Sequence, residues 1–206
     1  MTTGTDTPGA PAPRTQADRR ATTESRLLDA AFRIVAERGV RAVTTAAVGQ
    51  RAGYSRGIVN HQFGSRDGLM IRLAETAQAR FTPNPSGLRG REHVLGVIDA
   101  YLNMASSDPR QVRVFLRLWA AAIGDEEPSL REAFTHRDAF FREHFEQAIA
   151  EGVVDGTIRT DIDPPSTAVA LVGLVRGIAM QAQVAPDLAS DDRIRAAAHA
   201  LVDHGL

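Results

Sequence analysis

The sequence predicts an all-α fold of about nine helices, with an N-terminal three-helix helix-turn-helix domain and a larger C-terminal helical bundle. Apolar residues recur at three- and four-residue spacing along most of the chain, and no segment keeps the strict alternation of a strand. Apolar residues make up 43% of the chain and aromatic residues only 5%, so the core must consist mainly of Ala, Val, Leu and Ile. Prolines stand at or just outside the ends of the helical segments, at positions 109, 128, 164, 165 and 186.

Residues 1–21 are rich in Thr, Pro, Gly and Ala without apolar periodicity, and we expect a flexible tail there. The tail's arginines could enter a DNA minor groove, although a free solvated tail is the more common arrangement of such termini. The segment 82–87 contains two prolines and a glycine that break helices, and it divides the chain into domains 22–82 and 88–206.

The N-terminal domain is expected to form two short helices behind a longer amphipathic one. Gly39 can end the first helix, and Gly53 can form the turn between the two short ones. Thr44, Ser55 and Ser65 are suitable N-caps for the helices that follow them. The first predicted helix of this domain is capped by Thr22 or Thr23 and ends at Arg38, and the others cover residues 45–52, 56–62 and 65–81. The helices predicted in the C-terminal domain cover 91–106, 110–124, 129–152, 166–184 and 191–204.

Two short helices joined by a glycine turn are typical of a helix-turn-helix, whose second helix enters a DNA major groove. We expect Ile58, Val59 and Phe63 to face inward, while the outward face is small or polar. Arg56 can donate to guanine and Asn60 can pair with adenine, whereas residues at helix starts can meet phosphate. The expected DNA-binding residues are Thr44, Thr45, Ser55, Arg56, Gly57, Asn60, His61, Gln62 and Arg66.

The charge distribution agrees with this interpretation. Residues 14–82 contain twelve arginines and six acidic residues, a net charge of +6, whereas the remainder of the chain from residue 83 carries −6. A basic head on an acidic body is typical of proteins that bind a polyanion, although ordinary surface charge could give the same balance by chance.

Enzyme chemistry is not expected. The chain has no cysteine, which excludes disulfides and thiolate metal sites. It contains no glycine-rich phosphate loop, nucleophile elbow or zinc-protease pattern. His136 and His144 could face the same way but lack a third metal ligand, so we expect neither a metal site nor a cofactor.

The run from Ala52 to Asp67, AGYSRGIVNHQFGSRD, resembles the N-terminal domain of the TetR family of bacterial regulators almost position by position. The resemblance covers residues 24–81, and Glu37, Gly39 and Thr44 also stand at the family's spacing. Segments 113–124, 129–152 and 158–164 and the last two predicted helices resemble the BetI-like subgroup, which includes choline-responsive regulators. This looser match does not identify choline as the ligand.

Three positions depart from the family pattern. Asn60 replaces an aromatic residue, most often Tyr, that contacts a phosphate in the family. Asn60 can either hydrogen-bond to the same phosphate with a shorter reach or contact a base edge instead. Arg66 replaces a Lys and preserves its charge. Gly49 replaces an Ala, which weakens the helix by about 1 kcal/mol by propensity while permitting closer packing.

The resemblance implies a ligand-binding and dimerising C-terminal domain. Small residues on the apolar helix 166–184 and apolar residues on the last helix suggest a four-helix dimer interface with Gly173, Gly177, Ile194, Ala198 and Leu201, unless this face packs within the chain. The candidate ligand pocket contains Met104, Phe115, Trp119, Phe134, Phe141, Arg176 and Met180, although the aromatic residues could equally be core. Arg176 should pair with an acidic residue of helix 129–152 or meet an anionic ligand.

These features predict a cytoplasmic, homodimeric DNA-binding repressor, associated with the nucleoid when bound, which a small-molecule effector releases from a palindromic operator. A transcriptional activator or a ligand-independent regulator would use the same residues. A helical adaptor without DNA binding would leave the positive charge of residues 14–82 unexplained.

Overall fold

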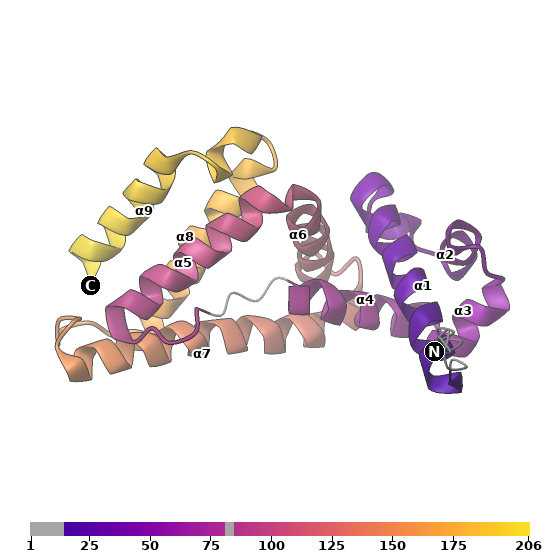
Figure 1. Ribbon diagram of the computed structural model, residues 1–206, viewed down its shortest axis with the longest axis horizontal. Helices are drawn as coiled ribbons and strands as arrows, with labels where there is room; N and C mark the ends of the chain where they lie inside the picture. Colours follow the sequence, from indigo (N-terminus) through magenta and orange to yellow (C-terminus); the bar gives the residue numbers. More distant parts are fainter. Residues whose placement is uncertain (1–14, 81–84) are drawn as a thin grey trace, which may run out of the picture.

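The computed structural model describes residues 15–80 and 85–206, and within these ranges the chain forms nine α-helices, three short 3-10 helices and no strand. This confirms the predicted all-α fold. Helices α1–α4 form a compact N-terminal unit at one end, and α5–α9 form the longer body beside it (Figure 1). Helix α4 ends at Arg80 and helix α5 begins at Gly90, on either side of the predicted domain boundary, and residues 81–84 lie outside the described ranges.

Helix α1 (Gln16–Arg38) begins earlier than the sequence pattern indicated. The Thr15 hydroxyl accepts from the Asp18 backbone N–H, and the Asp18 carboxylate accepts from the Thr15 backbone N–H, which forms a capping box. Residues 16–21, expected in a flexible tail, are therefore helical. The first turns of α1 are exposed, which explains why they lack apolar periodicity. The rest of the expected tail, residues 1–14, lies outside the described residues.

The helix-turn-helix consists of α2 (Thr45–Ala52) and α3 (Arg56–Phe63), followed by α4 (Arg66–Arg80). Thr44 and Ser55 cap α2 and α3, as predicted: their hydroxyl oxygens accept from backbone N–H groups at 3.1 and 3.4 Å. Gly53 takes the left-handed conformation, with φ of 76°, that the turn requires. The packing of α2 on the turn explains Gly49, since a Cβ there would lie 2.8 Å from the Tyr54 carbonyl oxygen.

The body contains α5 (Gly90–Ser107), α6 (Pro109–Ile123), α7 (Arg131–Asp155), α8 (Pro164–Ala182) and α9 (Asp192–Gly205). The long helix α7 packs against both α5 and α8, and α9 packs on α5 (Figure 1). Helix α6 contacts both α1 and α4, and α7 and the short 3-10 helix before it also contact α4, so these elements join the body to the N-terminal unit. By length and composition alone α8 could cross a membrane, but its buried face packs against α7 and α5, as in the core helix of a helical bundle.

Candidate nucleic-acid interface and body cavity

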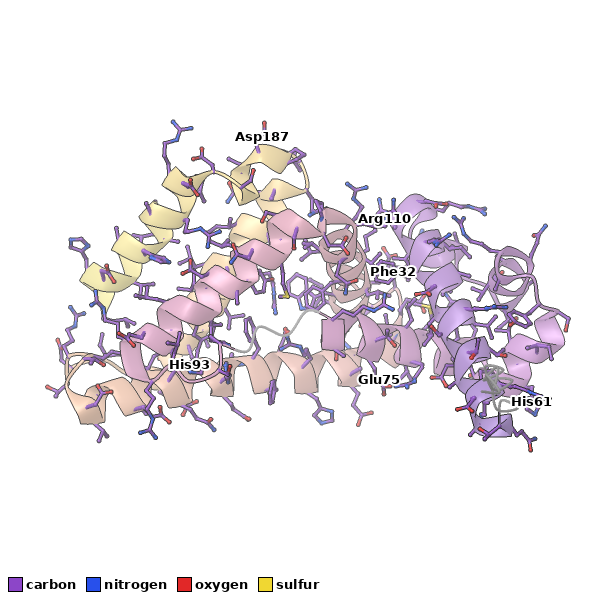
Figure 2. The ribbon with its side chains drawn as sticks, viewed as in Figure 1. Phe32, His61, Glu75, His93, Arg110 and Asp187 are labelled. Atoms are coloured by element: carbon purple, nitrogen blue, oxygen red, sulfur yellow. The ribbon has the colours of Figure 1, made fainter. Side chains whose placement is uncertain are left out.

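Helix α3 presents a polar outer face at the end of the molecule far from the body, where His61 projects outward (Figure 2). Ser55, Arg56, Gly57 and His61 are exposed, and Asn60 is half-buried. These five expected DNA-binding residues therefore lie on or beside one accessible surface. Helix α3 is held in this orientation because Val59 on its inner side is completely buried.

Ile58 was expected to face inward, but 42% of its surface is exposed. Only Val59 and the half-buried Phe63 supply the inner face of α3. The exposed isoleucine gives the outer face an apolar group, which can contact the methyl group of thymine. The apolar character of Ile58 suggested core packing, and its position between Gly57 and Val59 gave no contrary indication.

Two expected DNA-binding side chains point elsewhere. The Gln62 amide donates to Glu24 Oε2 at 3.0 Å, so this side chain ties α3 to α1 rather than facing outward. Glu24 also accepts from Arg72 Nε at 2.7 Å and thereby connects α1 with both α3 and α4. Thr45 is buried, so only its backbone N–H remains suited to a phosphate, while Thr44 is exposed at the start of α2.

Arg66 also differs from expectation, because its guanidinium is bound within the protein. Arg66 Nε donates to the Val43 carbonyl at 2.8 Å, and Nη1 and Nη2 donate to the Glu127 carboxylate at 2.8 and 2.6 Å. The Glu127 hydrogen bond raises the pKa of Arg66 above its usual value. The side chain expected to contact a phosphate thus also forms an ion pair between the N-terminal unit and the loop that follows α6.

Helix α6 adds two more polar links to the N-terminal unit. Arg117 Nη1 donates to the carbonyls of Val35 and Ala36 at 2.6 and 2.9 Å, which satisfies acceptors in the last turn of α1. The buried Gln111 amide donates to the Ala77 carbonyl of α4 at 3.1 Å. A displacement of α6 would therefore pull on α1 and α4 together.

A cavity of about 330 Å³ lies among α6, α7 and α8, and we call it the Trp119 cavity. Three of the predicted ligand-pocket residues line it: Trp119, Arg176 and Met180. Its full lining consists of Trp119, Arg142, Val169, Val172, Gly173, Arg176, Gly177 and Met180. Arg142 was not in the predicted set, because helix periodicity alone gives no sign that this arginine borders a cavity.

The other predicted pocket residues belong mainly to the core. Phe115, Phe134 and Phe141 are buried, with 2 or 3% of their surfaces exposed, and Met104 packs against the core from a half-buried position. Phe134 also borders a second hollow of about 100 Å³, whose lining includes Trp119 and Asp138 as well. Close packing of the phenylalanines against one another, such as Phe115 against Phe134, accounts for their burial.

Arg176 pairs with Asp138 of α7, which is one of the two arrangements expected from the sequence. Its Nη2 and Nη1 atoms donate to the Asp138 carboxylate at 2.8 and 3.1 Å, and Trp119 Nε1 donates to the same carboxylate at 3.1 Å. The Arg176 guanidinium also lies 4.7 Å from the centre of the Trp119 ring. Burial raises the pKa of nearby Tyr101 to about 12, so its hydroxyl stays protonated. Through its contacts with Asp138 of α7 and Trp119 of α6, Arg176 of α8 joins these three helices at the cavity.

Most of the predicted dimer residues lie on outward surfaces of α8 and α9. Gly173 and Leu201 are exposed, and Gly177 and Ile194 are half-buried. Ala198 is buried on the side of α9 that packs against the body, so it cannot meet a second chain there. A Cβ at Gly173 or Gly177 would meet no other atom within 4 Å, so these glycines leave room for an approaching helix or ligand.

Comparison with known proteins agrees with this arrangement. Residues 27–73 match the family of bacterial regulatory proteins called the tetR family, and residues 90–206 match the C-terminal domain of BetI-type transcriptional repressors. The HTH-type transcriptional regulator BetI of Stenotrophomonas maltophilia is 31% identical over 108 residues, which make up 49% of this chain and 55% of that protein. The chain thus spans about half the length of this curated relative.

Solved structures share the fold. A TetR-family regulator from Rhodococcus sp. has a TM-score of 0.72 and 22% identity, with 89% of this chain and 97% of that one covered. A transcriptional regulator from Saccharomonospora viridis in complex with choline has a TM-score of 0.73 and 18% identity, with coverage of 89% and 97%. With its two matched domains and this shared fold, the chain belongs to the TetR family of bacterial regulators and carries a BetI-type C-terminal domain.

Proposed function

We propose that this protein is a DNA-binding transcriptional regulator, and specifically a homodimeric repressor that a small-molecule effector releases from a palindromic operator. The outer face of α3 carries this proposal. Arg56, Gly57 and His61 are exposed there on a helix whose caps, turn and inner face hold it firmly. Membership of the TetR family supports the same function.

Each group on this surface has a distinct role in reading DNA. Arg56 donates a fork of two hydrogen bonds to guanine, and Asn60 and His61 meet base edges or adjacent phosphates. Ile58 contacts a thymine methyl group. Thr44, the Thr45 N–H group and Ser55 lie at helix starts, where hydroxyl and backbone N–H groups bind phosphate.

Dimerisation would place two copies of α3 in successive major grooves. A two-fold symmetric regulator of this kind binds half-sites about 34–36 Å apart, so the operator should be a palindrome or nearly one. Ile194 and Leu201 of α9, with the outward face of α8, supply the proposed interface. Gly173 and Gly177 lie on α8 where this interface would border the Trp119 cavity.

The Trp119 cavity is the proposed effector site. A larger hollow of about 510 Å³ at the end of α7 is lined by that helix and Arg89 alone, whereas the Trp119 cavity involves three helices. Helix α6 connects it to the N-terminal unit, because Trp119 borders the cavity and Arg117 holds the end of α1. An effector that favours the displaced state by a few kcal/mol would release the DNA.

A transcriptional activator and a ligand-independent regulator would use the same DNA-reading residues. The Saccharomonospora viridis regulator was solved in complex with choline, but at 18% identity this likeness does not carry its ligand over to this chain. A cytoplasmic location follows from the proposed work on DNA.

Selection of operators from random double-stranded DNA tests the proposal. The native protein should enrich a palindromic sequence, bind it as a dimer and bind it far more tightly than a scrambled duplex of equal length. Failure to enrich any sequence, or equal affinity for an enriched duplex and its scrambled version, would refute the proposed function.

A further inference from the structure

We propose that the Trp119 cavity takes an amphipathic anion, namely a small molecule with an apolar body and a carboxylate group, and excludes quaternary ammonium cations. This inference rests on the proposed effector site and names the chemical class of its ligand. At about 330 Å³, the cavity has the volume of a small-molecule site.

The balance of charge in the cavity favours an anion. Its lining contains two guanidinium groups, Arg142 and Arg176, and no acidic side chain. The adjacent Asp138 is already engaged, since it accepts from both terminal nitrogens of Arg176 and from Trp119 Nε1. Arg176 is therefore neutralised by its own partner, and one positive charge, that of Arg142, remains.

Arg142 is the group that a carboxylate would meet. It is half-buried on α7, and across residues 15–80 and 85–206 its side chain has no hydrogen bond or ion pair with another residue. Its guanidinium donors are therefore available to a ligand, and a carboxylate can bind a guanidinium through two parallel hydrogen bonds. Val169, Val172 and Met180 offer the rest of the ligand an apolar surface.

The same lining opposes a cation such as choline. Quaternary ammonium groups bind in cages of aromatic rings, and Trp119 is the only aromatic side chain that lines this cavity. One face of its ring already carries the Arg176 guanidinium at 4.7 Å. A bound cation would also be repelled by Arg142 without an acidic side chain in the lining to offset the repulsion.

The chain contains a built-in probe for the test, because Trp119 is its only tryptophan. Fluorescence excited at the red edge of tryptophan absorption therefore reports on the surroundings of Trp119, which borders both this cavity and the smaller hollow beside Phe134. Arg142 lines only the larger of the two, so its variants distinguish them. We would titrate the full-length protein, without DNA, with 4-phenylbutyrate, with its neutral amide and with choline. Phenylbutyrate should change the emission at the lowest concentration, the amide should bind about tenfold or more weakly, and choline should have no saturable effect.

Two substitutions of Arg142 and a matched control sharpen the result. Arg142→Gln should weaken phenylbutyrate by about tenfold or more and leave the amide nearly unchanged. Arg142→Glu should remove carboxylate binding altogether. Arg110→Gln removes the same charge from an exposed position at the start of α6, outside the cavity, and should behave like the native protein.

Saturable binding of choline, unchanged carboxylate affinity in Arg142→Gln, or no response to any of the three compounds would overturn the inference. The last result is expected if a partner chain fills the hollow beside Gly173 and Gly177. Release of a selected operator is measured separately. If phenylbutyrate binds without affecting DNA binding, the anion site stands and the proposed repressor mechanism fails. If choline releases the operator, the repressor mechanism stands and the anion site fails.

Discussion

Arg66 and Glu127 form a two-point ion pair across the boundary between the N-terminal unit and the body, with N–O distances of 2.6 and 2.8 Å. Only 8% of the Glu127 side chain is exposed, whereas 34% of the Arg66 side chain is. The third donor of the guanidinium, Nε, binds the Val43 carbonyl just before α2. One side chain thus fixes the start of α4, the approach to α2 and the loop after α6 relative to one another.

The first prediction concerns the strength of this link. Loss of one partner of a buried ion pair costs about 3–5 kcal/mol, and the partial exposure of Arg66 reduces this, so Glu127→Gln should lower the free energy of unfolding by about 1–3 kcal/mol. Glu126→Gln is the matched control, because its pair with Arg41 is exposed and should contribute below about 1 kcal/mol. Chemical denaturation measures both variants, and equal small losses would contradict the role given to Glu127.

The second prediction concerns the tight packing at the helix-turn-helix. In Gly49→Ala the new Cβ would lie 2.8 Å from the Tyr54 carbonyl oxygen, so the turn must shift. We expect a net loss of about 1 kcal/mol in unfolding free energy, although alanine favours helix. In Gly57→Ala the new Cβ meets only the Ser55 hydroxyl at 3.6 Å, and stability should rise by about 0.5–1 kcal/mol. A Gly49→Ala protein more stable than the native one would disprove the close approach.

The third prediction is a loss of stability in mildly acidic solution. The Nε2 atoms of His93 and His144 lie 3.0 Å apart between α5 and α7, and His93 Nδ1 donates to the Leu88 carbonyl. Burial, with the nearby His93 and Arg137, lowers the pKa of His144 below 6.5. The unfolded chain therefore binds this proton first as the pH falls, so stability is lost from about pH 6.5 down to the folded pKa.

Thermal unfolding at pH 7.5 and 5.5 tests this prediction. His144→Gln should reduce the difference between the two melting temperatures, because the group that titrates is gone. His136→Gln, an exposed histidine on the same helix, should leave the difference unchanged. The same loss of stability in all three proteins would assign the acid sensitivity to other groups.

Much of the fold could be predicted from the sequence because helix periodicity, glycine turns and polar caps act locally. The early start of α1 was missed, since its first turns are exposed and depend on the capping box between Thr15 and Asp18. The Arg66–Glu127 pair could not be found from spacing, because the partners are 61 residues apart in the chain.

The candidate sites were predicted unevenly for the same reason. The outer face of α3 follows from one short helix, and its polar residues were located correctly except for Gln62, which reaches across to Glu24. The Trp119 cavity depends on three helices, so Arg142 was missed and the buried phenylalanines were included. Helix periodicity identifies a buried side, but it does not distinguish a packed core from the wall of a cavity.

The central claim is that the outer face of α3 reads DNA bases, and Arg56→Ala tests it most directly. Affinities of the native and variant proteins would be measured by fluorescence anisotropy for the selected operator, for operators with single base changes, and for a scrambled duplex. The variant should lose about 1–3 kcal/mol on the operator, lose discrimination at one guanine, and bind the scrambled duplex almost as before. An Arg56→Ala protein that binds the operator as tightly and selectively as the native one would contradict the account.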